Sequence, residues 1–217
     1  VHQLLENLGG ASYQGIVGIN IGKNFNTPIE RAGADYVLGL RAVYQRADYV
    51  AVNISSPNTS NLRELQNGDA FTTLLKSLSD TRETLRKETG KNTPMAVKIA
   101  PDLDDLQLDF IVEALLEAGM DAVIATNTTL NRSGVQGHRY ASEGGGLSGS
   151  PVRKRSTEVI EGLAKRLNGK MPIIGVGGIF SVDDAKEKLD AGASLLQIYS
   201  GLIYRGPGLI GGIVRGL

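Results

Sequence analysis

The stretch PIIGVGGI, residues 172–179, decides between two α/β folds. It begins as a short apolar run, which is typical of a strand buried on both faces of a parallel sheet. It then reaches a pair of glycines, which leave backbone N–H groups open to a phosphate. A doubly wound sheet carries such a turn after its first strand, whereas a (β/α)8 barrel binds phosphate after its last two strands. Because PIIGVGGI lies late in the chain, it favours the barrel.

Similar apolar runs occur along the whole chain, and stretches with helical periodicity separate several of them. The runs cover residues 16–21, 49–54, 95–99, 122–126, 172–176 and 195–199, and the helical stretches cover 70–87, 103–118, 157–167 and 182–191. This alternation predicts an α/β fold. Six strands do not close an eight-stranded barrel. We therefore expect a partial (β/α)8 TIM barrel over residues 1–217, with strands 3 to 8 present and the first two absent from this chain.

The composition excludes several classes of protein. Lys and Arg together number 23, as do Asp and Glu, so the formal net charge is zero and the basic surface of a nucleic-acid-binding protein is not expected. With no Cys and two distant His, His2 and His138, no metal site is expected. No apolar run approaches the roughly 20 residues of a membrane-spanning helix. The 28 glycines cluster among apolar residues, which favours tight turns and close ligand contact over a flexible linker.

The ends of the predicted strands carry amides, hydroxyls, glycines and one cation. In an α/β barrel, side chains at the carboxyl ends of the strands point into the active site. These residues are Asn20, Asn53 with Ser56, Lys98, Thr126 with Asn127 and Thr128, Gly177 with Gly178, and Tyr199 with Ser200 and Gly201. There is no carboxylate pair for glycoside hydrolysis and no His base. One amide alone would usually satisfy loop backbone, but three at matching strand ends, with Asn58 close by, favour a polar planar ligand.

Three of the polar residues have more than one interpretation. Lys98 lies on a predicted buried strand, so its ammonium should either meet an anionic or electron-rich partner or reach solvent past its apolar stem. Ser56 has no visible His or Asp partner, so a structural hydroxyl is its default role. Asp102 is expected to cap the helix that follows it. The long connections 55–69 and 130–151 are expected to be lids or binding loops.

Seven motifs resemble, in the same order, the class 2, quinone-dependent dihydroorotate dehydrogenases in their bacterial form. The motifs are INIGKN, VNISSPNTSNLRELQ, VKIAPDL, ATNTT, GGLSG, PIIGVGGI and GASLLQIYSGLIYRGP. They extend from about residue 15 to residue 207, which is most of the chain. A set of seven ordered motifs is far more specific than any one glycine turn.

The resemblance implies an FMN-containing barrel that oxidises dihydroorotate to orotate in pyrimidine synthesis. The residues that it implies for FMN are Asn20, Asn53, Lys98, Thr126, Gly149, Gly178, Tyr199 and Ser200. Those that it implies for the substrate are Asn53, Asn58, Asn127 and Thr128. Ser56 would be the base that removes the C5 proton while hydride passes from C6 to the flavin; class 1 relatives use a cysteine there. Lys98 would stabilise the negative charge that develops on the flavin, and SNLRELQ would belong to a loop over the site.

The resemblance further implies a quinone as final electron acceptor. It implies peripheral attachment to the cytoplasmic side of the cell inner membrane, through an N-terminal segment absent from this chain. We expect a chain without the first two strands to expose strand edges, to bind FMN poorly and to aggregate or oligomerise.

Two other interpretations are open. One is a different FMN-dependent barrel oxidoreductase, acting on dihydropyrimidines or hydroxyacids. A hydroxyacid oxidase should carry a His base at a strand end, whereas His138 lies in a predicted loop. The other is a barrel that binds phosphate or flavin without catalysing a reaction.

Overall fold

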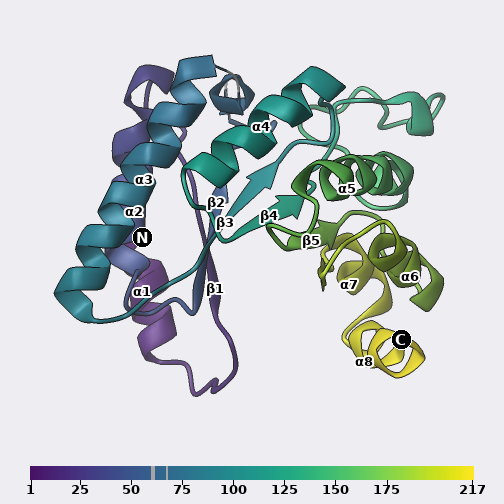
Figure 1. Cartoon of the computed structure of the whole chain (residues 1–217). Helices are drawn as coiled ribbons and strands as arrows, with labels where there is room; N and C mark the ends of the chain where they lie inside the picture. Colours follow the sequence, from purple (N-terminus) through teal and green to yellow (C-terminus); the bar gives the residue numbers. More distant parts are fainter. Residues whose placement is uncertain (60–61, 67) are drawn as a thin grey trace.

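A six-stranded parallel sheet forms the centre of the molecule (Figure 1). The computed structural model describes residues 1–59, 62–66 and 68–217. The strands are β1 (Gly18–Ile21), β2 (Tyr49–Asn53), β3 (Met95–Ile99), β4 (Ala122–Ala125), β5 (Ile173–Val176) and β6 (Leu195–Gln197). Each strand pairs with the next one in the sequence, and the sheet curls into part of a barrel. The predicted α/β barrel fold and all six predicted strands are therefore confirmed.

Helices run along the outside of this curled sheet (Figure 1). They are α1 (His2–Gly9), α2 (Ala32–Val43), α3 (Gly68–Thr89), α4 (Asp105–Glu117), α5 (Arg153–Leu167), α6 (Val182–Asp190), α7 (Ser200–Arg205) and α8 (Gly208–Gly216). Short 3-10 turns occur at η1 (Ile29–Arg31), η2 (Leu62–Gln66), η3 (Ser133–Val135) and η4 (Ser150–Val152). The four predicted helical stretches correspond to α3, α4, α5 and α6, whereas α1, α2, α7 and α8 lie outside them.

Helix α2 escapes prediction because Gly33 and Gly39 lower its intrinsic helix propensity. The helix forms because Tyr36 and Leu40 are completely buried against the rest of the core. Gly39 faces β1, where a Cβ at its position would be in ordinary van der Waals contact with the side chain of Ile21 at 3.4 Å. Burial of Tyr36 and Leu40 thus outweighs local propensity.

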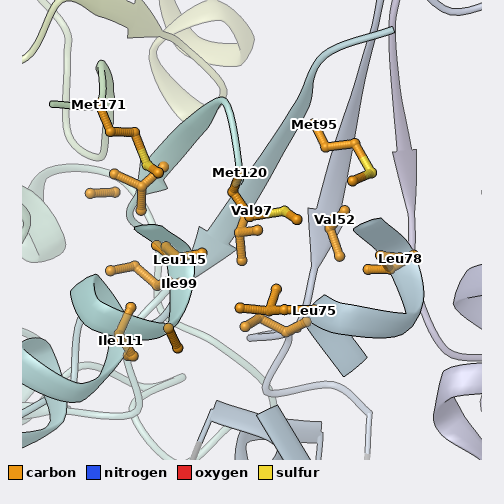
Figure 2. Packing of buried hydrophobic residues seen from close by; sticks show 14 of the residues in the cluster. Val52, Leu75, Leu78, Met95, Val97, Ile99, Ile111, Leu115, Met120 and Met171 are labelled. Atoms are coloured by element: carbon orange, nitrogen blue, oxygen red, sulfur yellow. The ribbon is translucent and has the colours of Figure 1, made fainter. Parts of the chain in front are cut away.

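The main hydrophobic core lies between the outer face of the sheet and the helices (Figure 2). Strand residues Val52, Met95, Val97 and Ile99 meet Leu75 and Leu78 of α3 and Ile111 and Leu115 of α4, and all eight are completely buried. Burying one such side chain contributes about 1.5–3 kcal/mol. This core fixes the strands, and with them the residues at the strand ends.

The inner face of the sheet carries a smaller core and a layer of polar side chains. Ala51, Ala96, Ile124 and Val176 form a buried cluster on this face. Parallel pairing places Asn53 beside Lys98 and Val176 beside Gln197. Because side chains alternate between the two faces along a strand, Asn53, Lys98 and Gln197 share the inner face near the carboxyl ends. The register therefore gathers these polar groups above a small apolar floor.

The longest helix described is α3, with 22 residues, and its buried residues lie on one side of an otherwise polar helix. None of the helices within residues 1–59, 62–66 and 68–217 is both long enough and apolar enough to cross a membrane.

Candidate active site

A cavity of about 260 Å³ lies at the carboxyl ends of strands β3 to β6. Nine of the twelve residues that the family resemblance implies line it: Asn58, Lys98, Thr126, Asn127, Thr128, Gly149, Gly178, Tyr199 and Ser200. The other three, Asn20, Asn53 and Ser56, are not among its lining residues. The carboxyl-end placement expected of a barrel active site is therefore found for most of the predicted set.

A network of amides joins the loops that follow β2 and β4. The Nδ2 group of Asn127 donates to Oδ1 of Asn53 at 3.0 Å and to Oγ of Ser55 at 3.1 Å. The Ser55 hydroxyl in turn donates to the carbonyl oxygen of Lys98 at 2.7 Å. Ser55 is completely buried. These bonds fix the orientation of both amides, and Asn127 lines the cavity.

Lys98 is half-buried on β3, and its Nζ donates to Oε1 of Gln197 on β6 at 3.3 Å. No salt bridge within the described parts of the chain involves Lys98. Burial lowers the pKa of the Lys98 amine, because the charged form loses its hydration. An anionic or electron-rich ligand in the cavity would favour the charged form again. Gln197 was not predicted from the sequence, although it lines the same cavity.

Glycines form one end of the cavity, next to the start of α5 and α7. Gly178 has a φ of +72°, and a Cβ there would lie 2.5 Å from Cβ of Arg153 and 3.0 Å from the carbonyl oxygen of Gly149. Within the described chain, the backbone N–H groups of Gly177 and Gly178 donate to no protein acceptor. The Ser200 hydroxyl donates to Oγ of Ser148 at 2.9 Å. Bare N–H groups and hydroxyls without side-chain bulk are the features that suit a phosphate.

Both long connections predicted to be binding loops contribute to the cavity. Asn58 comes from the connection after β2, whereas Gly146 and Gly149 come from the connection after β4. The two loops touch, since a Cβ on Gly145 would lie 2.6 Å from Oδ1 of Asn58. Arg132 holds the second loop by donating to the carbonyl oxygens of residues 129, 143 and 145. The loops thus form one wall of the site together.

Ser56 and Asn20 lie outside the cavity lining. Ser56 is half-buried, and its Oγ accepts a hydrogen bond from the backbone N–H of Asn58 at 3.3 Å. Asn20 is exposed near the carboxyl end of β1. Within the expected covering stretch SNLRELQ, Ser60 and Asn61 lie outside the described residues. The base role of Ser56 stays a prediction.

The prediction that Asp102 caps helix α4 is wrong. Asp104 is the N-cap: its side chain accepts from the backbone N–H of Gln107 at 2.8 Å, and the Gln107 side chain accepts from the backbone N–H of Asp104 at 2.9 Å. Asp102 still lies in the loop before the helix. It accepts from Oγ1 of Thr129 at 2.5 Å and from the backbone N–H of Leu130 at 3.0 Å. It therefore belongs to the loop after β4 rather than to α4.

Fold and cavity together define an α/β-barrel protein with a ligand site at the carboxyl ends of its strands. The family model of dihydroorotate dehydrogenase matches residues 2–217. The chain therefore belongs to the dihydroorotate dehydrogenase family.

Individual relatives agree with this assignment. A protein of Chromobacterium violaceum named dihydroorotate dehydrogenase (quinone) is 59% identical over 215 residues, which cover 99% of this chain and 62% of the relative. One of Vibrio atlanticus with the same name is 54% identical over 217 residues, which cover 100% of this chain and 65% of the relative. The crystal structure of ligand-free DHODH from Eimeria tenella superposes with a TM-score of 0.88 at 35% identity, over 99% of this chain and 64% of that one. The chain thus spans less than two thirds of the length of these relatives.

Membership of this family implies a flavin cofactor. Two features of the chain fit such a group. The half-buried ammonium of Lys98 faces the cavity without a carboxylate among the described residues. At the other end, Gly149 and Gly178 line the cavity, and Gly178 packs so closely that a Cβ there would lie 2.5 Å from Cβ of Arg153. A molecule with an electron-rich ring at one end and a phosphate at the other matches both.

Proposed function

We propose that this chain forms the flavin- and substrate-binding part of a quinone-dependent dihydroorotate dehydrogenase, which oxidises dihydroorotate to orotate in pyrimidine synthesis. The observation that carries the proposal is the assembly of nine expected residues around one cavity. The family match and the names of the relatives support it. Because the chain spans less than two thirds of those relatives, the activity is proposed for the full-length protein.

In this proposal the cofactor is FMN, which when bound supplies the hydride acceptor. Gly149, Gly178, Tyr199 and Ser200 would hold its phosphate through backbone N–H groups and hydroxyls. Asn20, Asn53, Lys98 and Thr126 would contact the flavin. The Lys98 ammonium would stabilise the negative charge of a reduced flavin. The flavin would in turn be the electron-rich partner that a buried ammonium requires.

Asn53, Asn58, Asn127 and Thr128 would bind the carboxylate and the ring amides of dihydroorotate. The mixed donors and acceptors of amides and hydroxyls suit a uracil-like ring. Ser56 Oγ would take the C5 proton of the substrate while its own hydroxyl proton passes to solvent, since Ser56 is only half-buried. The hydrogen bond that the Asn58 backbone N–H donates to this oxygen favours the charged form of the base, because it stabilises negative charge on Oγ.

The remaining parts of the proposal concern the electron acceptor and the location. A quinone would be the final electron acceptor, as the names of the relatives suggest. The full-length protein would associate peripherally with the cytoplasmic side of the cell inner membrane, through a segment outside this chain.

The test is the rate at which dihydroorotate reduces the bound flavin in the full-length protein under anaerobic conditions. Ser56→Ala should lower this rate by about 10²–10⁴-fold, the usual contribution of a general base, while the flavin content stays unchanged. Ser133→Ala is the control, because this exposed serine lies in the loop after β4 outside the cavity lining. Reduction of Ser56→Ala at the wild-type rate would contradict the proposed base. Absence of flavin reduction by dihydroorotate in the wild type would favour a barrel that binds without catalysis.

A further inference from the structure

Arg63 forms hydrogen bonds with three loops that begin at the carboxyl ends of the strands. It lies in η2, in the connection after β2. Its Nε donates to the carbonyl oxygen of Ser55 at 3.3 Å, and its Nη2 donates to the carbonyl oxygen of Thr128 at 2.7 Å. Its Nη1 pairs with Oδ2 of Asp102 at 2.8 Å. One side chain therefore reaches the loops that follow β2, β3 and β4.

Asp102, the partner of Arg63, also binds the loop that follows β4. The same carboxylate that pairs with Arg63 accepts hydrogen bonds from Thr129 and Leu130, the two residues after Thr128. Partial burial raises the pKa of Asp102, but the bonds from Thr129, Leu130 and Arg63 outweigh it, so that the pKa lies below its ordinary value. The carboxylate is therefore charged at neutral pH, as the pair with Arg63 requires.

The pair is well placed and partly shielded from water. The side chains of Arg63 and Asp102 are 20% and 29% exposed. A guanidinium donates several hydrogen bonds in a fixed planar geometry, so it sets the relative positions of the acceptors it joins. Here two of these acceptors are the carbonyl of Ser55, one residue before Ser56, and the carbonyl of Thr128, which lines the cavity.

We propose that Arg63, held by Asp102, is a positioning residue that sets the distance between the base loop with Ser56 and the substrate-binding segment at Thr128. The inference rests on the function proposed above. Arg63 is not among the cavity-lining residues, so it acts through the backbone of its neighbours rather than on the substrate. It controls how well a bound substrate is aligned with the base, and leaves the binding of FMN unchanged.

The chain offers a matched control at the opposite end of the sheet. Arg82 pairs with Asp121 at 2.5 Å and donates to the carbonyl oxygen of Gly119 at 2.9 Å. Asp121 also accepts from the backbone N–H of Met95 at the start of β3. This second Arg–Asp pair therefore ties backbone segments together far from the carboxyl ends. Arg63→Met and Arg82→Met each remove an Arg–Asp pair together with hydrogen bonding to backbone carbonyl oxygen. Only Arg63, however, contacts the loop that carries Ser56.

The experiment uses the full-length, FMN-loaded protein and measures stability, flavin content and anaerobic flavin reduction over a range of dihydroorotate concentrations. Arg63→Met should reduce flavin about 10²-fold more slowly at saturating substrate, the loss expected from a misplacement of about 1 Å. The apparent dissociation constant of dihydroorotate should also rise, because Thr128 moves. Arg82→Met should lose a similar amount of stability and reduce flavin at the wild-type rate. Arg63→Lys, which keeps the charge but not the planar fork, should lie between Arg63→Met and the wild type.

Equal flavin reduction in Arg63→Met and Arg82→Met would overturn the inference. If Arg63→Met does not fold, the same comparison between Arg63→Lys and Arg82→Lys decides. Slow reduction in Ser56→Ala together with normal reduction in Arg63→Met would refute the role of Arg63 alone. Normal reduction in both would refute the role of Ser56 in the proposed function.

Discussion

Replacing Gly178 with alanine introduces a single methyl group at the glycine end of the cavity, where two separate costs arise. Gly178 has a φ of +72°, a backbone conformation that costs an L-residue about 1–2 kcal/mol. The new Cβ would also lie 2.5 Å from Cβ and 2.9 Å from Cα of Arg153, so the start of α5 would have to move. Such overpacking typically costs about 1–3 kcal/mol. The free energy of unfolding should therefore fall by about 2–5 kcal/mol.

Gly169 provides the control for the backbone cost. Its φ is +76°, but a Cβ there would meet no atom within 4 Å. Gly169→Ala should therefore lower the free energy of unfolding by only about 1–2 kcal/mol. Urea denaturation of both variants without flavin isolates the packing cost as the difference between them.

The same variant tests the assignment of this end of the cavity to a phosphate. Displacement of the loop at Gly178 should weaken FMN binding at least tenfold, equivalent to about 1.4 kcal/mol, whereas Gly169→Ala should leave it unchanged. Flavin affinity is measured by fluorescence of the free flavin. The reasoning is refuted if Gly178→Ala is no more destabilising than Gly169→Ala, or if it binds FMN as tightly as the wild type.

Two further predictions concern parts of the fold outside the cavity. Burial lowers the pKa of Lys188 from 10.5 to about 8, so between these pH values the unfolded state binds more protons and the stability of the wild type rises with pH. Denaturation experiments at several pH values compare the unfolding free energies of the wild type and Lys188→Met. Between pH 8 and pH 10.5 the wild type should gain about 3 kcal/mol relative to the variant. A gap between the two that stays constant with pH would contradict this prediction. Asp104→Ala removes the cap of α4 and should lower the unfolding free energy by about 1 kcal/mol in urea denaturation; an unchanged midpoint and slope would show that the capping box contributes nothing.

The strands were predictable because parallel strands buried on both faces give nearly continuous apolar runs. The stretch Met95–Ile99 is the clearest case, with one lysine among apolar residues. Helix α3 was predictable from its repeating apolar positions, which the structure buries. Helix α8 was not, because Gly211 and Gly212 interrupt a nine-residue segment and leave no strong helical signal. Tertiary packing decides such segments, and a single sequence does not reveal it.

Some residues of the candidate site could likewise be predicted from the sequence, whereas others could not. Lys98 could be found from the sequence, since a charge within an apolar strand is conspicuous. Gln197 could not, because its partner Lys98 lies 99 residues away along the chain. Arg63 reaches Asp102 and Thr128 over 39 and 65 residues. Local patterns identify polar residues at strand ends but not the long-range contacts that orient them.

The assignment of the helix cap to Asp102 failed for a different reason. Two aspartates precede α4 within three positions, and either could have supplied the capping oxygen. The choice depends on the residue at which the helical dihedral angles begin, which sequence patterns locate only to within one or two residues.

The order of strands in the sheet has a consequence for how the protein is made. Every strand pairs with the strand that follows it, at sequence separations between 21 residues (Ile174 with Leu195) and 50 residues (Val123 with Ile173). Each strand pairing can therefore form as soon as its second strand has left the ribosome, without waiting for distant segments. Lys98 thus has its neighbour Asn53 before Gln197 has been synthesised. The apolar outer core can assemble during translation, and the ligand site is completed last, when β6 joins the sheet.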